Sequence, residues 1–176
     1  MKSTKHILIC GDVGAGKSTL IRRLVAQSSR PICGFVTKRE PADESGESPT
    51  YIHPANTSER FLTPLNLIGS CNKGRCSFCH PKVFDTYGAE LLAAKPDSII
   101  LMDELGFMEN DAMIFRDAVI KALDGDIPVI AAVKSTQTPF LDELRGHENA
   151  QVCYITHKNR DATFEKLLPI VYAIWE

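Results

Sequence analysis

Short runs of apolar residues alternate with amphipathic segments along this chain of 176 residues. The apolar runs have the length and continuity of strands buried on both faces, and they cover residues 6–10, 31–37, 97–102, 128–133 and 151–156. Helical spacing of apolar positions predicts helices over residues 19–28, 87–95, 111–123, 139–145 and 161–174. This alternation predicts an α/β domain with a mainly parallel sheet covered by helices on both faces.

The segment between the second and third apolar runs breaks this alternation. Residues 38–49 are polar, with proline, glycine and acidic residues, and they are typical of a loop. Residues 50–52 and 60–68 are strand-like without a helical period between them, which predicts a small antiparallel hairpin region. We expect a single domain over residues 1–176, with a cysteine-containing hairpin insert at about residues 70–81.

A glycine-rich stretch joins the first predicted strand to the first predicted helix. It fits the phosphate-binding pattern G-x-x-x-x-G-K-[ST] and consists of Gly11, Asp12, Val13, Gly14, Ala15, Gly16, Lys17 and Ser18. The glycines permit backbone conformations that a Cβ would forbid, so that successive N–H groups point toward a polyphosphate. Lys17 can reach the β- and γ-phosphates, and the Ser18 hydroxyl can join the coordination shell of Mg²⁺.

Thr19 continues this motif into the predicted helix, whose positive N-terminal end faces the bound anion. The alternative for such a stretch is a glycine-rich surface turn. Because the motif lies between a buried strand and an amphipathic helix, it instead predicts a nucleotide site. The expected fold is therefore that of a P-loop NTPase, a three-layer α/β/α sandwich.

Two carboxylates follow the third apolar run directly. Asp103 comes where the run ends, so its side chain is expected at the carboxyl edge of the sheet, beside the phosphate-binding loop. An acid in this place supports Mg²⁺ in phosphate-loop enzymes. Glu104 faces differently and is placed to orient or deprotonate an attacking water. Together with Lys17, Glu104 is the predicted catalytic residue, and the pair of acids favours hydrolysis over transfer to a second substrate.

Other cations lie near the same predicted edge. Lys134 ends the fourth apolar run and is either a γ-phosphate sensor or a solvated lysine. Five arginines are candidates to offset charge in the transition state, namely Arg39, Arg60, Arg116, Arg145 and Arg160. The sequence does not choose among them.

Composition narrows the classes of partner. The formal net charge of −2 gives no basic footprint of the kind that nucleic-acid-binding proteins carry. The longest apolar runs, at residues 99–102 and 129–133, are far too short to span a bilayer. The apolar run after the first lysines is also too short for a signal peptide. We therefore expect a cytoplasmic protein that binds neither nucleic acid nor membrane.

The chain resembles the small P-loop nucleoside-triphosphatase family of archaea, thermophilic bacteria and animals. Besides the phosphate-binding loop, the resemblance rests on Gly34-Phe35-Val36-Thr37, Asp103-Glu104-Leu105-Gly106-Phe107-Met108-Glu109 and Asn159-Arg160-Asp161. It implies Mg²⁺-dependent hydrolysis of ATP, GTP and other nucleoside triphosphates with little base selectivity. It also implies that Asn159 and Arg160 belong to the nucleotide site, near the base. An Asn-Lys-x-Asp guanine signature is missing, so strict guanine specificity is not expected.

Two segments depart from that family's pattern. Lys134 stands where a histidine is expected, and residues 70–81 differ from the usual hairpin. This insert carries Cys71, Cys76 and Cys79, with the spacing C-x₄-C-x₂-C-H. The three thiols are candidate ligands for a structural Zn²⁺ or for part of an iron–sulfur cluster. His80 is too close to Cys79 to share the ion easily, so a fourth ligand would come from His53, Cys33 or a partner chain. Free thiols or a reactive C-x-x-C pair are the alternatives.

Three functional hypotheses follow from the sequence. The first is an Mg²⁺-dependent nucleoside-triphosphate phosphohydrolase that uses Lys17, Ser18, Asp103 and Glu104. The second is a nucleotide or small-metabolite kinase with residues 38–60 as its acceptor site. The third is a nucleotide-dependent accessory switch for a metalloenzyme, with the cysteine loop as the docking element for a protein partner.

Overall fold

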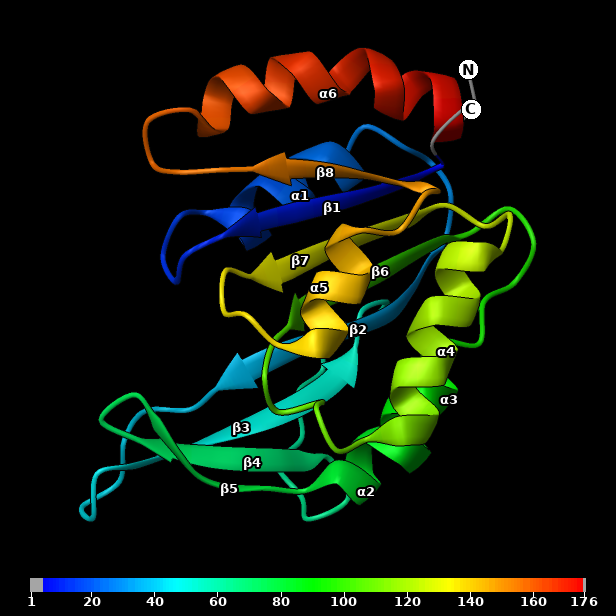
Figure 1. The fold of residues 1–176 in the computed structure, drawn as a ribbon. Helices are drawn as coiled ribbons and strands as arrows, with labels where there is room; N and C mark the ends of the chain where they lie inside the picture. Colours follow the sequence, from blue (N-terminus) through cyan, green and yellow to red (C-terminus); the bar gives the residue numbers. More distant parts are fainter. Residues whose placement is uncertain (1–4, 176) are drawn as a thin grey trace.

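The computed structural model describes residues 5–175, which form one eight-stranded sheet with helices on both faces (Figure 1). In chain order the strands are β1 (His6–Gly11), β2 (Ile32–Arg39), β3 (Glu47–Pro54), β4 (Leu67–Asn72), β5 (Arg75–Cys79), β6 (Ile99–Leu105), β7 (Val129–Lys134) and β8 (Ala150–Tyr154). The helical elements are α1 (Lys17–Val25), α2 (Pro81–Val83), the π-helical turn η1 (Phe84–Gly88), α3 (Ala89–Leu91), α4 (Met113–Asp124), α5 (Pro139–Arg145) and α6 (Arg160–Trp175). The spatial order of the strands is β5-β4-β3-β2-β6-β7-β1-β8.

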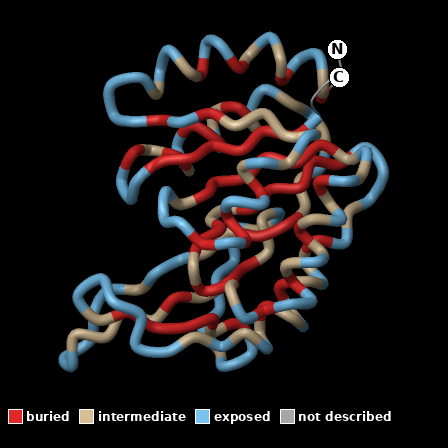
Figure 2. Tube along the Cα trace, viewed as in Figure 1, coloured by how far each residue is buried: buried red, intermediate tan, exposed pale blue. Residues whose placement is uncertain are grey.

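The parallel part of the sheet runs from β2 to β8 and contains the strands that the apolar runs predicted. These central strands are the most deeply buried part of the chain (Figure 2). Alternate residues of β1 face opposite layers: Ile7 and Ile9 pack with α1 and α6, whereas Leu8 and Cys10 pack with α4 and α5. The predicted three-layer α/β/α fold with a mainly parallel sheet is thus confirmed.

Strands β3, β4 and β5 extend the sheet in antiparallel fashion beyond β2. The turn between β4 and β5 contains Lys73 and Gly74, both with positive φ (46° and 82°), as a two-residue type I′ hairpin requires. The prediction of a strand over residues 60–68 was wrong, because β4 begins only at Leu67 and residues 59–63 form a loop. Strand β3 also begins at Glu47, inside the predicted polar loop.

The predicted helix at residues 87–95 lies earlier in the chain, because helical structure begins at Pro81 and ends at Leu91. Phe84 drives this start, since its fully buried ring packs against Phe115 of α4 with the ring centroids 5.1 Å apart. The Asp85 carboxylate accepts a hydrogen bond of 2.9 Å from the Phe115 N–H, in the first turn of α4. Asp85 therefore caps the N-terminus of α4, although it lies in a different helical segment.

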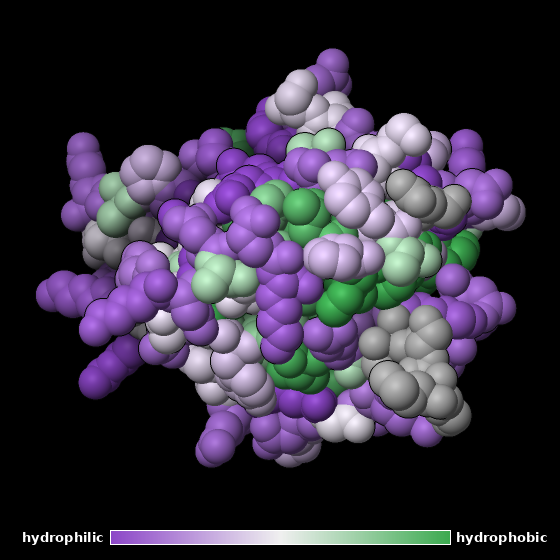
Figure 3. Space-filling view, turned by 90° about the horizontal axis from the view of Figure 1, so that it is seen from above, coloured by the Kyte–Doolittle hydropathy of each residue, from purple (hydrophilic) through white to green (hydrophobic). Residues whose placement is uncertain are grey.

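The face covered by α6 shows a band of hydrophobic residues bordered by polar and charged ones (Figure 3). On α6 itself, Leu168, Ile170 and Ile174 are only partly buried.

Within residues 5–175 no helix combines the length and the apolarity that crossing a bilayer requires.

Candidate nucleotide site

The phosphate-binding loop connects β1 to α1 at the carboxyl edge of the parallel strands. Gly14 and Gly16 have φ values of 82° and 94°, which a side chain would oppose. A Cβ on Gly11 would lie 2.6 Å from the carbonyl oxygen of Ile155, so only glycine fits there as well. The first turn of α1 contains no acidic residue, and its free N–H groups can receive an anion. This conformation matches the prediction from the motif.

Lys17 is buried at the first position of α1, with 4% of its surface exposed. Its Nζ donates hydrogen bonds to the carbonyl oxygens of Gly11 (2.8 Å) and Asp12 (2.9 Å). The same nitrogen forms an ion pair of 2.9 Å with Glu104 Oε2, on the other side of the loop. The two predicted catalytic residues are therefore in direct contact.

Ser18 and Asp103 form a second contact between α1 and the end of β6. The Ser18 hydroxyl donates a hydrogen bond of 2.8 Å to Asp103 Oδ1. Burial raises the pKa of the Asp103 carboxyl, and the hydrogen bond from Ser18 offsets part of that rise. A desolvated carboxylate beside a hydroxyl is better stabilised by a cation than by water, and the two predicted Mg²⁺ ligands do lie side by side.

Lys134 contacts the same carboxylate from the end of β7. Its Nζ lies 3.4 Å from Glu104 Oε1 and 5.2 Å from the centroid of the Phe107 ring. Only 18% of its side chain is exposed, so Lys134 is not the solvated lysine that the sequence allowed. Glu104 is thus held between Lys17 and Lys134, which fixes the orientation of its carboxylate.

The turn after β6 is held by Glu109, whose Oε2 accepts a hydrogen bond of 3.0 Å from the Gly106 N–H. Only 2% of Glu109 is exposed, and burial raises the pKa of its carboxyl from 4.5 to about 7. The nearby charge of Lys134 opposes this rise, whereas that of Glu104 adds to it. Glu109 is therefore close to half-protonated at neutral pH.

We expect Glu109→Gln to change how stability depends on pH. The folded protein binds the Glu109 proton more tightly than the unfolded chain, so this stabilisation is complete below pH 4.5 and is lost as the pH rises to about 7. The amide of Gln mimics the protonated acid, so the variant should not lose this stability. In the wild type, the free energy of unfolding should fall by about 3 kcal/mol as Glu109 ionises. Urea unfolding of both proteins from pH 4.5 to 8 measures this difference. Parallel stability curves for wild type and variant would contradict the assignment.

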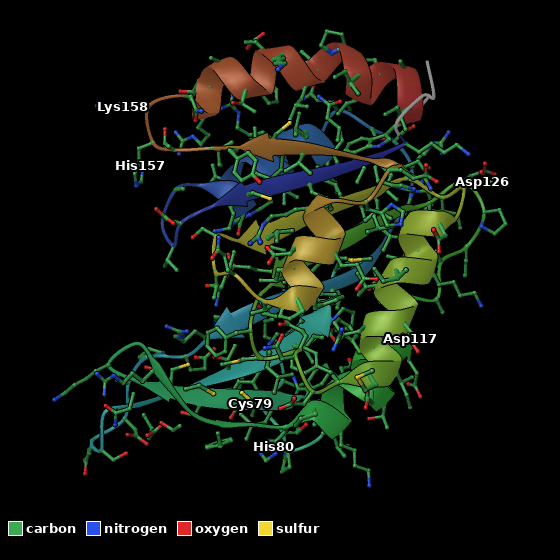
Figure 4. All side chains as sticks on the ribbon, viewed as in Figure 1. Cys79, His80, Asp117, Asp126, His157 and Lys158 are labelled. Atoms are coloured by element: carbon green, nitrogen blue, oxygen red, sulfur yellow. The ribbon has the colours of Figure 1, made fainter. Side chains whose placement is uncertain are left out.

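Asn159 ends the loop between β8 and α6, and Arg160 is the first residue of α6, next to Gly16 of the phosphate-binding loop. Asn159 organises this loop: its Oδ1 accepts a hydrogen bond from the Thr156 N–H (2.7 Å), and its Nδ2 donates one to the Tyr154 carbonyl (3.1 Å). A Cβ on Gly16 would lie 2.8 Å from the Arg160 Cδ, so the Arg160 side chain packs on the phosphate-binding loop. The neighbouring His157 and Lys158 lie at the same edge of the sheet (Figure 4).

The structure places the five candidate arginines in different surroundings. Arg60 donates hydrogen bonds to the carbonyls of Thr57 and Glu59. Arg145 donates hydrogen bonds to the carbonyls of Lys134 and Thr136 and thereby holds the loop after β7. Arg116 of α4 lies over the ring of Phe140 in α5, with its guanidinium carbon 5.0 Å from the ring centroid. Arg39 contacts the Cys71 sulfur at 3.7 Å. Arg160 is the one that touches the phosphate-binding loop, and its Nε is buried without a hydrogen-bond partner within residues 5–175.

The three cysteines of the insert are not arranged as a metal site in the described part of the chain. Among residues 5–175, no three or more His, Cys, Asp or Glu side chains are arranged to hold an ion, so the prediction of zinc or an iron–sulfur cluster at Cys71, Cys76 and Cys79 is not supported. Cys76 and Cys79 are free thiols with their sulfur atoms 2.8 Å apart. Burial, helped by Cys76, raises the pKa of the Cys79 thiol to about 12, so this group is a protonated thiol at neutral pH in the metal-free protein. Cys79 and His80 lie at the end of β5, in the antiparallel part of the sheet (Figure 4).

Two further residues of the site were not predicted from the sequence, namely Glu109, which lies in the Asp103–Glu109 segment, and Ser135. The Ser135 hydroxyl donates a hydrogen bond to the Asp12 carboxylate and so ties the loop after β7 to the phosphate-binding loop. A hydrophobic neighbourhood around an acid in the Asp103–Glu109 segment was the available signal for Glu109. Ser135 gave none, because one serine in a polar loop looks like any other.

The fold and the loop define a phosphate-loop nucleotide-binding protein. A sequence model of the NTPase family matches residues 6–168, and the chain therefore belongs to the NTPase family. It is 30% identical to the nucleoside-triphosphatase THEP1 of Thermotoga petrophila over 170 residues, which cover 94% of this chain and 92% of that protein. It is 27% identical to the THEP1 of Methanocaldococcus jannaschii over 174 residues, covering 96% and 98% of the two chains.

Two solved structures share the fold. The crystal structure of THEP1 from the hyperthermophile Aquifex aeolicus superposes with a TM-score of 0.71 at 22% identity, covering 94% of this chain and 98% of the other. The solution structure of a human cancer-related nucleoside triphosphatase gives a TM-score of 0.65 at 21% identity, covering 96% and 98%. Both similarities agree with the predicted architecture.

Proposed function

We propose that this chain hydrolyses nucleoside 5′-triphosphates to diphosphates and phosphate, with Mg²⁺ as cofactor. The observation that carries the proposal is the contact between the phosphate-binding lysine and the acid after β6: Lys17 Nζ lies 2.9 Å from Glu104 Oε2. It brings an electrophilic cation and a base to the place where a terminal phosphate enters the loop. Family membership and the names of the relatives support the same reaction.

Ser18 and Asp103 suit Mg²⁺, because a hydroxyl and a carboxylate are hard oxygen donors and they are already 2.8 Å apart. An Mg²⁺ held by these two residues would supply positive charge that offsets the negative charge of the phosphates. The raised pKa of Asp103 fits this assignment, since a buried carboxylate without a cation is costly to ionise.

In the proposed reaction Lys17 binds the phosphates and Glu104 accepts a proton. Lys17 exchanges the carbonyls of Gly11 and Asp12 and the Glu104 carboxylate for phosphate oxygens when the nucleotide binds. Glu104 then accepts the proton of the attacking water as the water oxygen bonds to the γ-phosphorus. The bond from that phosphorus to the bridging oxygen breaks, and the diphosphate leaves. Lys134 keeps the carboxylate of Glu104 in position from the other side.

Arg160 and the loop held by Asn159 complete the nucleotide site. Within the described residues, Arg160 Nε has no hydrogen-bond partner and lies 3.8 Å from Asp161 Oδ1. Its side chain packs on Gly16, and this position suits a cation that contacts the phosphates or the sugar. Because the chain has no guanine signature, we assign it low selectivity among bases.

The direct test is phosphate release from ATP, GTP, CTP and UTP by the purified protein. We expect release from all four, with rates within about tenfold of one another because the contacts lie mainly on the phosphates. Chelation of Mg²⁺ with EDTA should abolish release, and added Mg²⁺ should restore it. Tight nucleotide binding without release would contradict hydrolysis and favour a kinase.

A further inference from the structure

A cavity of about 590 Å³ opens between α1 and β2, outside the phosphate-binding loop. Residues 11–18 do not line it. Asp103 does, and the same carboxylate accepts the Ser18 hydroxyl, so one end of the cavity adjoins the proposed Mg²⁺ and terminal-phosphate position. Its volume falls within the range of about 300–1,000 Å³ that is usual for small-molecule sites.

The walls of this cavity are apolar, whereas cations stand at its rim. Ile21 and Val25 of α1, Val36 of β2 and Leu101 of β6 supply the apolar surface. The cations are Arg22, Lys38 and Arg60. Such a combination suits a ligand with a hydrophobic body and an anionic group.

Two of the three cations are held in place by backbone carbonyl groups, and the charge of Arg22 also acts on the Asp103 carboxylate at the end of the cavity. Arg22 Nε donates a hydrogen bond of 3.2 Å to the Ser18 carbonyl. Arg60 NH1 donates to the carbonyls of Thr57 (2.6 Å) and Glu59 (2.9 Å). Neither guanidinium forms an ion pair within the part of the chain that the structure describes. Lys38, by contrast, is paired with Glu40 at 3.2 Å. Two guanidinium groups match a dianionic phosphate better than a monoanion.

The cavity lies away from Asn159 and Arg160, the residues that the family resemblance places near the base. Asn159 and Arg160 follow β8 at one edge of the sheet, whereas the cavity adjoins β2 and β6 on the other side of β1 and β7. A triphosphate on the loop would lie between these two places, with its base toward Arg160 and its terminal phosphate toward Asp103.

We propose that this cavity binds a second small molecule, a phosphomonoester with a compact apolar body, next to the terminal phosphate of the nucleotide. Its phosphate pairs with Arg22 and Arg60, and its body packs on Ile21, Val25, Val36 and Leu101. The cavity and its cations are observed in the structure. The position of the terminal phosphate beside the cavity rests on the proposed hydrolytic function. Residues 38–60, the acceptor region that a kinase would need, supply part of this lining.

Phenyl phosphate is a suitable probe, because it combines one aromatic ring with a dianionic phosphate. Calorimetric titration is carried out with ADP and Mg²⁺ present, so that the phosphate-binding loop is already occupied. We expect saturable binding of phenyl phosphate, and binding at least about tenfold weaker for inorganic phosphate, for phenol and for the monoanion benzoate. Amide NMR shifts are expected at Val36, Lys38 and Ala55 and not at Gly14 or Gly16.

Variants connect the binding to the cavity. Arg22→Gln combined with Arg60→Gln should weaken phenyl phosphate binding by about tenfold or more. The matched control, Arg75→Gln combined with Lys95→Gln, removes two exposed positive charges elsewhere and should leave the affinity unchanged. Ala55→Trp fills the cavity and should abolish phenyl phosphate binding while nucleotide hydrolysis continues. If this variant does not fold, Ala26→Trp at the exposed end of α1 fills the cavity in its place.

Absence of saturable binding, or equal affinity in wild type and the Arg22/Arg60 variant, would overturn the proposal. Failure of the hydrolytic function is a separate result: no phosphate release from any nucleoside triphosphate, with phenyl phosphate still bound and still dependent on Arg22 and Arg60.

Discussion

Lys17→Ala is expected to lower Mg²⁺-dependent phosphate release by roughly 10³-fold. The phosphate-binding loop encloses Lys17, whose Nζ is hydrogen-bonded to the carbonyls of Gly11 and Asp12 and paired with Glu104. Removal of a positioned donor or cation from developing negative charge typically costs 10²–10³-fold or more in rate. Nucleotide affinity should fall as well, because this ammonium contacts the β- and γ-phosphates in the bound state as well as in the transition state.

The measurement is steady-state phosphate release together with calorimetric binding of a non-hydrolysable ATP analogue. Lys158→Ala is the matched control, since Lys158 is an exposed lysine at the same edge of the sheet and should keep both properties (Figure 4). Glu104 remains paired with Lys134 in the variant, so the fold should persist, and thermal unfolding checks this. A Lys17→Ala protein with wild-type turnover would refute the assignment of the loop.

The parts of the site that were predictable from sequence are those that local backbone chemistry determines. Gly14 and Gly16 adopt positive φ because the loop needs it, and a strand–loop–helix pattern places Lys17 at the helix start. Asp103 was predictable for a similar reason: parallel strands end at a common edge, so an acid that follows a buried run lies near the loop.

The unpredicted parts depend on contacts between distant segments. Nothing local to Lys134 shows that Glu104 and Phe107 enclose it, and nothing local to Arg160 shows that it packs on Gly16. The antiparallel strands were misplaced because β3 and β4 lie near the sheet edge, where polar residues such as Glu47 occur within strands. The helical segment from Pro81 was missed because a long-range ring contact, Phe84 on Phe115, stabilises it more than helical periodicity does.

Glu104→Gln is expected to separate binding from turnover. Gln keeps the size and the acceptor oxygen of the side chain but cannot take a proton from water at neutral pH, so phosphate release should fall by about 10²–10⁴-fold. Nucleotide affinity should be unchanged or higher, because the variant loses the 2.9 Å ion pair that occupies Lys17 before the nucleotide arrives. Binding and turnover thus move in opposite directions, which neither unfolding nor a general loss of charge would produce.

The matched control is Glu90→Gln, which changes an exposed carboxylate on α3 and should leave both quantities at wild-type values. A second comparison is Asp103→Asn. This variant should bind Mg²⁺ more weakly, because Asp103 and Ser18 form the oxygen pair proposed to hold the ion. The decisive readout for Glu104 is single-turnover phosphate release at saturating ATP, where binding no longer limits the rate. If Glu104→Gln retains the wild-type single-turnover rate, the carboxylate only positions Lys17 and Lys134, and the base that activates water is another group.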